Sequence, residues 1–246
     1  MMRTGKIWQT SGVRLGAAVL ILVFSTGLLP AGELQAIKLN PPDLKRGLPF
    51  METLAVRASV REFSEKELSR QDLSDLLWAA DGMSRPAVNK STAPSAMNSH
   101  DVRIYVFTKD GAYLYDSPRH ELLPVLAGDF RSQLMMARPP RPASPAGATP
   151  PPGAAPPPPP PAPSNPPVQI VLVSDGDRFT RGDFERKFEW GALDAGIVSQ
   201  NISLFCAATG LKTVPRALVD KARIRELLKL TQAQTVFLNH PVGYAK

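Results

Sequence analysis

The stretch WGALDAGIVSQNISLFCAATGLKTVP, residues 190–215, decides the fold of this chain. Up to Leu211 it contains no proline and a single charged residue, Asp194. Small residues recur in it at helical spacing, and bulkier apolar residues form a second stripe. The small residues are Ala192, Ala195, Gly196, Ser199, Ser203, Cys206, Ala207 and Gly210, and the bulkier ones are Leu193, Ile197, Leu204, Ala208 and Leu211. We therefore expect a long buried helix that stops at Gly210, with both faces covered, one of them by a helix that a second copy of the chain could supply.

A membrane-spanning helix is the alternative for this stretch. Its polar residues favour the helix of a globular protein, because buried polar groups are costly in hydrocarbon. These residues are Asp194, Ser199, Gln200, Asn201, Ser203 and Thr209.

The composition argues against several kinds of protein. The chain has 246 residues and a formal charge of +7, but its Lys and Arg residues are scattered, which gives little support for nucleic-acid binding and suits a basic pocket for a phosphate-bearing ligand equally well. The single cysteine, Cys206, excludes an intrachain disulfide, and its apolar neighbours predict a buried thiol rather than a nucleophile. The three histidines, His100, His120 and His240, show no metal-ligand spacing, so we expect no metal site.

The N-terminus, residues 1–36, has the pattern of an export signal. Arg3, Lys6 and Arg14 precede an apolar run at residues 15–29, and the small residue Ala36 follows. The run is shorter than the roughly 20 residues of a spanning helix. We expect an exported, periplasmic protein, with an uncleaved N-terminal anchor as the alternative.

Residues 138–167 contain 16 of the 26 prolines of the chain. Such a composition cannot bury a core and predicts disorder or polyproline II. Because patterned segments flank both of its ends, we interpret it as an insertion into one domain of residues 37–246 rather than as a linker. A tolerated loop is the simpler explanation, and binding of a partner that recognises proline is the alternative.

The remaining pattern predicts an α+β fold. Ser69 with Asp72 resembles a capping box that opens a helix ending at Gly82, and Asp183 can cap the long helix. Alternation at residues 102–108 and 112–116 predicts a β-hairpin. We further expect helices at residues 48–57, 120–137 and 220–230, and strands at residues 168–174 and 235–238.

Candidate binding residues cluster in the run Arg57-Ala58-Ser59-Val60-Arg61. On extended backbone, Arg57, Ser59 and Arg61 face one side and could clamp a phosphate or a planar polar ring. Arginines at such a turn are otherwise ordinary solvated charges.

Taken together, several segments resemble the nitroreductase family of FMN-dependent oxidoreductases, and within it the branch of azoline-forming peptide dehydrogenases. The matching segments are residues 57–61 (RASVR), 76–85 (LLWAADGMSR), 93–100 (APSAMNSH), 111–122 (GAYLYD and HEL), 194–201 (DAGIVSQN) and 210–220 (GLKTVPRALVD). They run in order through the chain beyond residue 36, the proline-rich segment excepted.

This resemblance implies an α+β homodimer, with a sheet flanked by helices, the long helix at the dimer core and FMN at the subunit interface. It places Arg57, Ser59 and Arg61 at the flavin phosphate and ring edge, and Ser95 and Asn98 at the ring system. Arg216 and Ala217 match the place where backbone N–H groups approach the reactive flavin edge, and Lys246 is a candidate phosphate partner. Family members commonly carry glycine where this chain has Lys212 and Ala217.

The expected function is hydride transfer through the flavin to or from an unidentified small molecule. Because that chemistry belongs to the cofactor, no side chain is expected to act as a catalytic acid or base. Asp194 and Asn201 are expected to be buried polar groups that are satisfied across helices and fix the dimer register. The alternative function is a catalytically idle exported interaction module of the same fold, whose proline-rich loop binds a partner.

Overall fold

The computed structural model describes residues 33–136 and 166–246. Its described part contains a seven-stranded sheet with the strand order β1-β6-β5-β4-β7-β9-β8. Every neighbouring pair of strands in it is antiparallel. The strands are β1 (Ile37–Lys38), β4 (Val102–Phe107), β5 (Gly111–Asp116), β6 (Glu121–Ala127), β7 (Val168–Asp175), β8 (Lys212–Thr213) and β9 (Gln234–Gly243). A separate small hairpin joins β2 (Met83–Arg85) to β3 (Lys90–Ser91). The expected α+β class is confirmed.

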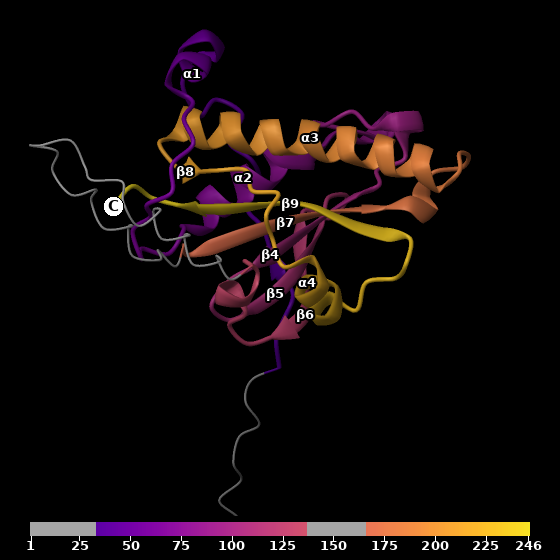
Figure 1. Cartoon of the computed structure of the whole chain (residues 1–246). Coiled ribbons are helices and arrows are strands. Elements are labelled where there is room, and N and C mark those ends of the chain that lie inside the picture. Colours follow the sequence, from indigo (N-terminus) through magenta and orange to yellow (C-terminus); the bar gives the residue numbers. More distant parts are fainter. Residues whose placement is uncertain (1–32, 137–165) are drawn as a thin grey trace, which may run out of the picture. The chain divides into compact units, whose positions relative to one another are not determined.

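Strand β7 lies in the middle of the sheet, and its apolar residues serve two cores. Ile170 and Leu172 belong to the core on one face, while Val171 and Val173 belong to the core on the other. Helices α2 (Arg70–Asp81) and α3 (Phe184–Thr209) cover the first face, and α4 (Lys221–Leu228) covers the second (Figure 1). A strand buried on both faces reads as a continuous apolar run, which explains the sequence VQIVLVS.

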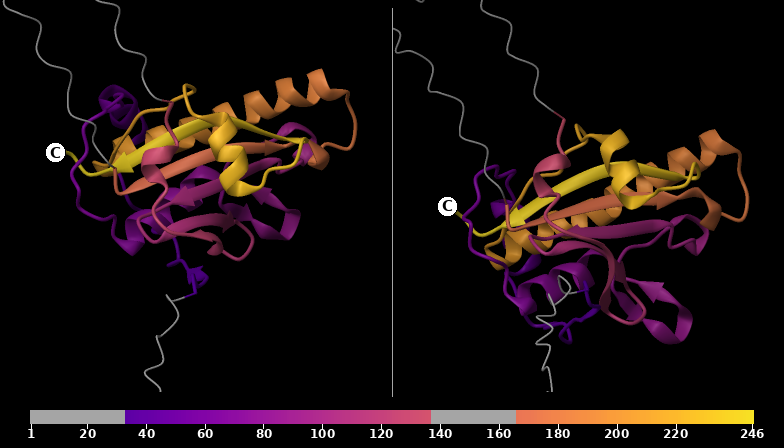
Figure 2. Two further views of the ribbon diagram at one scale, coloured as in Figure 1. Left: turned by 60° about the horizontal axis from the view of Figure 1, so that its bottom comes forward. Right: turned by 90° about the horizontal axis from the view of Figure 1, so that it is seen from below.

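Helix α3 starts and stops where the sequence predicts. The Asp183 side chain accepts a hydrogen bond from the Arg186 backbone N–H, and Gly210 ends the helix with a φ of 81°. The face toward the sheet consists mostly of small residues: Gly191, Asp194, Ala195, Val198, Ser199, Ile202, Ser203 and Cys206. The part of the chain that the structure describes leaves the opposite face open, since Leu193 is 61% exposed, Ile197 is 36% exposed and α3 lies at the outside of the fold (Figure 2).

Helix α2 is held at its N-terminus by polar contacts. The Ser69 hydroxyl accepts a hydrogen bond from the Asp72 N–H, as the capping pattern predicts, and Leu76, Leu77 and Ala80 are fully buried. Arg46 forms ion pairs with Asp72 and Asp75 of this helix. These contacts tie the N-terminal segment of the domain to the core.

The predicted helix at residues 120–137 is wrong. Its first part is strand β6, which pairs with β5 and β1, and the rest contains only the short 3₁₀ turn η3 (Arg131–Gln133). Pro124 would break a helix, whereas here it lies opposite Tyr113 next to a register shift in the β5–β6 ladder. The tight turn after Asp116 leads the chain straight back along β5, so strand pairing wins over local helical preference.

The other elements match with changed lengths. Helix α1 (Phe50–Val56) and α4 fall inside the predicted ranges, and Asp220 caps α4. The last strand extends through Gly243, well beyond the predicted 235–238. Residues 93–100 contain the short 3₁₀ turn η2 (Ala96–Asn98). No helix among the described residues is long and apolar enough to cross a membrane.

The C-terminal limit of the proline-rich segment also needs correction. Pro166 and Pro167 are buried, and the buried Arg131 guanidinium donates hydrogen bonds to their carbonyl oxygens at 3.2 and 3.0 Å. They belong to the folded domain, while the rest of the predicted insertion lies outside the described residues. The predicted signal does so too, except for residues 33–36, of which Leu34 packs against the core.

Replacing residues 138–164 by a short Gly/Ser turn is expected to leave the melting temperature equal or higher, because each halving of loop length lowers the closure cost by only about 0.6 kcal/mol. Extending the deletion through Pro167 is the matched comparison. It replaces the two buried prolines whose carbonyl oxygens accept from Arg131 by flexible residues, and loss of these hydrogen bonds should cost about 1–3 kcal/mol. Thermal unfolding of the two variants, followed by circular dichroism, measures both effects. If the 138–164 replacement is unfolded, the insertion is needed for the fold.

Candidate functional site

The arginine run at residues 57–61 lies beside the C-terminal end of α3. It leaves α1 as extended chain, and the Val60 N–H donates a hydrogen bond to the Thr213 carbonyl at 3.0 Å. Arg57, Ser59 and Arg61 are all exposed. The predicted clamp is therefore on the surface and is anchored to the sheet through β8.

Arg216 joins this group from the segment that follows β8. Its backbone exchanges two hydrogen bonds of 2.8 Å with Asn239 of β9, which fixes its position, and the side chain is half-buried. Burial and then the positive charge of Arg61 lower the pKa of the Arg216 guanidinium. Two guanidinium groups that repel each other at one edge of a sheet make a favourable place for an anion.

The C-terminus reaches the same end of the molecule. The Ser64 N–H donates to the Tyr244 carbonyl at 3.1 Å, and the Tyr244 hydroxyl donates to Asp72 at the start of α2. Lys246 is exposed two residues further on. The structure thus gathers Arg57, Ser59, Arg61, Arg216, Ala217 and Lys246 around one end of the sheet, where Figure 1 shows α1, β8 and the C-terminus together.

The positions that replace the common glycines are accommodated without backbone strain. Lys212 lies in β8 and pairs with Gly243, and neither Lys212 nor Ala217 has a positive φ. Ala217 is exposed, and its N–H donates to no acceptor within residues 33–136 and 166–246. A ligand at this edge could therefore accept a hydrogen bond from it.

A cavity of about 70 Å³ separates the arginine run from α3. Val56, Ala58 and Val60 line one wall, and Ser203, Cys206 and Ala207 of α3 line another. Burial raises the pKa of the Cys206 thiol well above its usual range, so this cysteine is a packing residue, as the sequence indicates.

Ser95 and Asn98 lie elsewhere, at the N-terminal half of α3. The Ala96 N–H between them donates to Asp194 Oδ2 at 2.8 Å. Ser95 Oγ accepts a hydrogen bond from the His100 N–H, and the Asn98 amide bonds Lys90 Nζ at 2.7 Å and the Asn89 carbonyl. From Asp194 to Cys206 is roughly 18 Å along a helix at about 1.5 Å per residue. One chain therefore does not bring these two residues to the arginine run.

Three buried aspartates surround the Ser95–Asn98 turn. Asp81 ends α2, Asp101 precedes β4, and Asp194 lies on α3. Burial raises the pKa of Asp81 to about 7, and burial together with the neighbouring Asp101 raises the pKa of Asp194 to about 7. The sequence singled out Asp194 but not Asp81 or Asp101, which look like ordinary turn residues until the fold brings them together.

Asn201 makes the predicted contact with another helix, and Asp194 does not. The Asn201 amide donates to the Ala80 carbonyl of α2 at 3.2 Å, which is the expected contact across helices. Asp194 is buried and satisfied, but by the turn at Ala96 rather than by a helix. His240, a residue the sequence did not assign, links Ser199 of α3 to Thr213 of β8, and burial lowers its pKa to about 3, so it is neutral.

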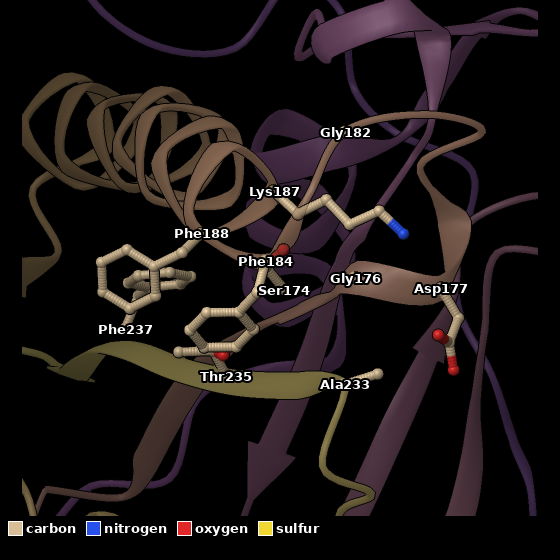
Figure 3. A pocket seen from close by; sticks show the side chains of 10 residues that line it. All are labelled: Ser174, Gly176, Asp177, Gly182, Phe184, Lys187, Phe188, Ala233, Thr235 and Phe237. Atoms are coloured by element: carbon tan, nitrogen blue, oxygen red, sulfur yellow. The ribbon is translucent and has the colours of Figure 1, made fainter.

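A cavity of about 220 Å³ opens at the start of α3 (Figure 3). Phe184, Phe188 and Phe237 gather on one side of it, and the Lys187 chain extends along another side toward Asp177. The loop that borders this cavity also holds the Ser95–Asn98 turn, since Arg181 Nε donates to Met97 Sδ at 3.2 Å. A second cavity of about 280 Å³ includes Asp81, His100 and Arg178 in its lining. Among the described residues no cluster of potential metal ligands is present.

Comparison with known proteins identifies the family of the chain. The model of the nitroreductase family matches residues 54–244. The chain belongs to the nitroreductase family. It is therefore assigned to the oxidoreductases.

Two relatives each cover 86% of the chain. A candidate nitroreductase of Methanocaldococcus jannaschii is 27% identical over 218 residues, which are 86% of this chain and 98% of that protein. The crystal structure of a candidate nitroreductase from Ralstonia eutropha JMP134 is 28% identical, has a TM-score of 0.70 and shares 86% of this chain and 90% of its own.

A more distant likeness extends to a microcin synthetase. The Escherichia coli microcin synthetase McbBCD complex, solved with truncated pro-MccB17 bound, contains a chain with a TM-score of 0.58 and 15% identity. The match covers 95% of this chain and 85% of that one. At this identity the likeness shows a shared fold.

Proposed function

We propose that the protein is an FMN-dependent oxidoreductase that works as a homodimer. The observation that carries the proposal is the convergence of Arg57, Arg61 and Arg216 at one sheet edge, next to the available N–H of Ala217. This donor set is purely cationic and hydrogen-bonding, which suits a phosphate and the carbonyl edge of a planar ring.

The charges and hydrogen-bond donors of these residues match the phosphate and the ring of FMN. Arg57, Arg61 and Lys246 supply charge for the phosphate, Ser59 supplies a hydroxyl donor, and the Ala217 amide can donate to the ring. FMN, when bound, supplies two-electron hydride transfer. The protein then has to bind and orient the cofactor and exclude water, and needs no acid–base pair of its own.

Ser95 and Asn98 enter the site from a second copy of the chain. Within one chain, these two residues and the arginine run lie near different ends of α3. If two α3 helices pair antiparallel, the Ser95–Asn98 turn of one copy lies next to the arginine run of the other. The uncovered face of α3 and the exposed apolar side of α1 support this arrangement. The exposed apolar residues are Phe50, Met51, Leu54, Val56, Leu193 and Ile197.

The first test is whether the purified chain carries flavin and which residues hold it. Arg57→Ala and Arg61→Ala should each weaken FMN binding at least about tenfold, because each removes charge-assisted bonds worth about 1.5–3 kcal/mol. Arg119→Ala, on the turn between β5 and β6, is the matched control. A colourless protein that does not bind added FMN would favour an idle interaction module, and wild-type affinity in both variants would contradict the assignment.

The shared site predicts that breaking the dimer also empties it. Leu193→Arg places a charge on the uncovered face of α3 and should yield a monomer by light scattering, with FMN affinity reduced at least about tenfold. Glu185→Arg, on the exposed first turn of the same helix, controls for the added charge. Wild-type flavin content in a monomeric variant would contradict the shared site.

We also propose that residues 1–36 direct the domain out of the cytoplasm, where nicotinamide donors are scarce. The charges of Arg3, Lys6 and Arg14 ahead of the apolar run suit an N-terminus that stays inside. A reporter fused after Lys246 should be active only outside, and single-turnover reduction should be slower with NADH or NADPH than with a membrane quinol, a redox protein or an oxidisable substrate with oxygen as acceptor. A reporter that is active only in the cytoplasm, together with faster reduction of the flavin by NAD(P)H than by the other donors, would refute this proposal.

A further inference from the structure

The turn that carries Ser95 and Asn98 has an uncommon backbone. Met97, Asn98 and His100 have φ values of 55°, 57° and 47°, although none of them is glycine. Non-glycine residues rarely adopt this left-handed region, and they keep it only where the surroundings hold them there. The shape of this turn therefore depends on its neighbours.

Several hydrogen bonds hold the turn besides the contacts of Asn98 and Met97 described above. The Ala96 N–H donates to Asp194 Oδ2 at 2.8 Å, the His100 N–H donates to Ser95 Oγ at 3.0 Å, and Arg178 Nε donates to the Ser99 carbonyl at 3.0 Å. Of these, only the first joins the turn to α3. Asp194 therefore fixes the turn relative to the helix on which the shared site depends.

Asp194 is itself paired with a second carboxyl group. It is 4% exposed and lies beside the side chain of Asp101, which is fully buried and raises the pKa of Asp194. Asp101 accepts hydrogen bonds from Ser99 Oγ at 3.0 Å and Ser174 Oγ at 2.5 Å. Two carboxylates this close repel each other when both are charged, so a proton on Asp194 stabilises the contact.

Helix α3 packs closely on β7 beside this pair. A Cβ atom added to Gly191, one turn before Asp194, would lie 2.3 Å from Ser174 Oγ. The helix thus touches the strand where the Asp101–Asp194 pair forms. The other charged or titratable groups near the pair are Asp81 at the end of α2, Arg178 in η4 (Gly176–Arg178) and His100 in the turn itself.

We propose that Asp194 is a positioning residue: sharing one proton with Asp101, it holds the 95–100 turn in its flavin-binding shape, and losing that proton weakens flavin binding. This inference rests on the proposed function for the identity of the ligand. It adds a regulation of that site by pH, carried by residues that do not touch the flavin.

The direction of the effect follows from the pKa of Asp194, which burial and Asp101 raise to about 7. Below that pH the folded protein keeps the proton and the turn is held. Above it, two buried negative charges repel, so affinity for FMN should fall by up to about tenfold for each further pH unit.

The test measures FMN binding to the full chain by flavin fluorescence from pH 6 to 9. Wild type should bind more weakly above about pH 7, whereas Asp194→Asn should bind with nearly constant affinity. The Asn amide oxygen can still accept from Ala96, and its NH₂ group can donate to the Asp101 carboxylate, which imitates the shared proton at every pH. Taking the wild-type to Asn ratio at each pH cancels the flavin's own titration.

Two further variants separate positioning from general stability. Asp194→Leu removes the acceptor and should bind FMN weakly at all pH values. Asp81→Asn removes a buried carboxyl whose pKa also lies at about 7 but which has no bond to the turn, and it should keep the wild-type decline. A flat wild-type profile, or an undiminished decline in Asp194→Asn, would overturn the proposal.

Hydrogen exchange on flavin-free protein keeps the inference testable if the proposed cofactor is wrong. Absence of FMN binding at every pH would refute the cofactor, not the positioning. Amides of residues 95–100 should then exchange faster above pH 7 in wild type than in Asp194→Asn, by more than the intrinsic pH dependence. Equal exchange in the two proteins would refute the role of Asp194.

Discussion

The close packing of α3 on β7 is the contact on which the rest of the domain depends. It requires small side chains on the helix, and Gly191 is the strictest case because Ser174 Oγ occupies the place of any Cβ. The same small residues leave space for polar groups to meet across the interface, so Ser199 can bond His240 and Asp194 can reach Ala96. Both ends of α3 thereby become attachment points for loops that carry candidate ligand contacts.

This arrangement explains why the candidate site is split. The arginine run is attached to β8 at one end of the helix, and the Ser95–Asn98 turn is attached to Asp194 toward the other. A helix with one face buried in its own domain and the other exposing Leu193 and Ile197 is suited to pairing with a copy of itself. The proposed homodimer makes use of this open face of α3.

Much of the fold could be predicted from local signals. Asp183, Ser69 and Gly210 mark helix ends because the two side chains and the glycine's positive φ act within one turn of the chain. Residues 120–137 misled because apolar residues at near-helical spacing can equally fill a strand that pairs with its predecessor, and only the pairing distinguishes them.

The site was less readable than the fold. The arginines could be recognised because they lie within five residues of one another, whereas the Asp101–Asp194 pair joins distant segments and depends on the tertiary packing. The distance between Arg57 and Ser95 along α3 likewise depends on tertiary packing and could not be predicted from the sequence. A set of candidate ligand residues predicted from the sequence does not indicate which of them come from the same copy of the chain.

The position of the proline-rich segment has a consequence for how the domain folds. Strands β4, β5 and β6 follow one another closely and can pair as soon as they exist, but β7, which contributes to both cores, comes only after the insertion. Pairing Phe107 with Gln169 closes a long loop before the central contacts are gained, which places this step late and makes it slow. Until then the edge of β4 is open to solvent and to other chains. The clamp of Arg131 on Pro166 and Pro167 lies next to the start of β7, where it can secure that strand once it has docked.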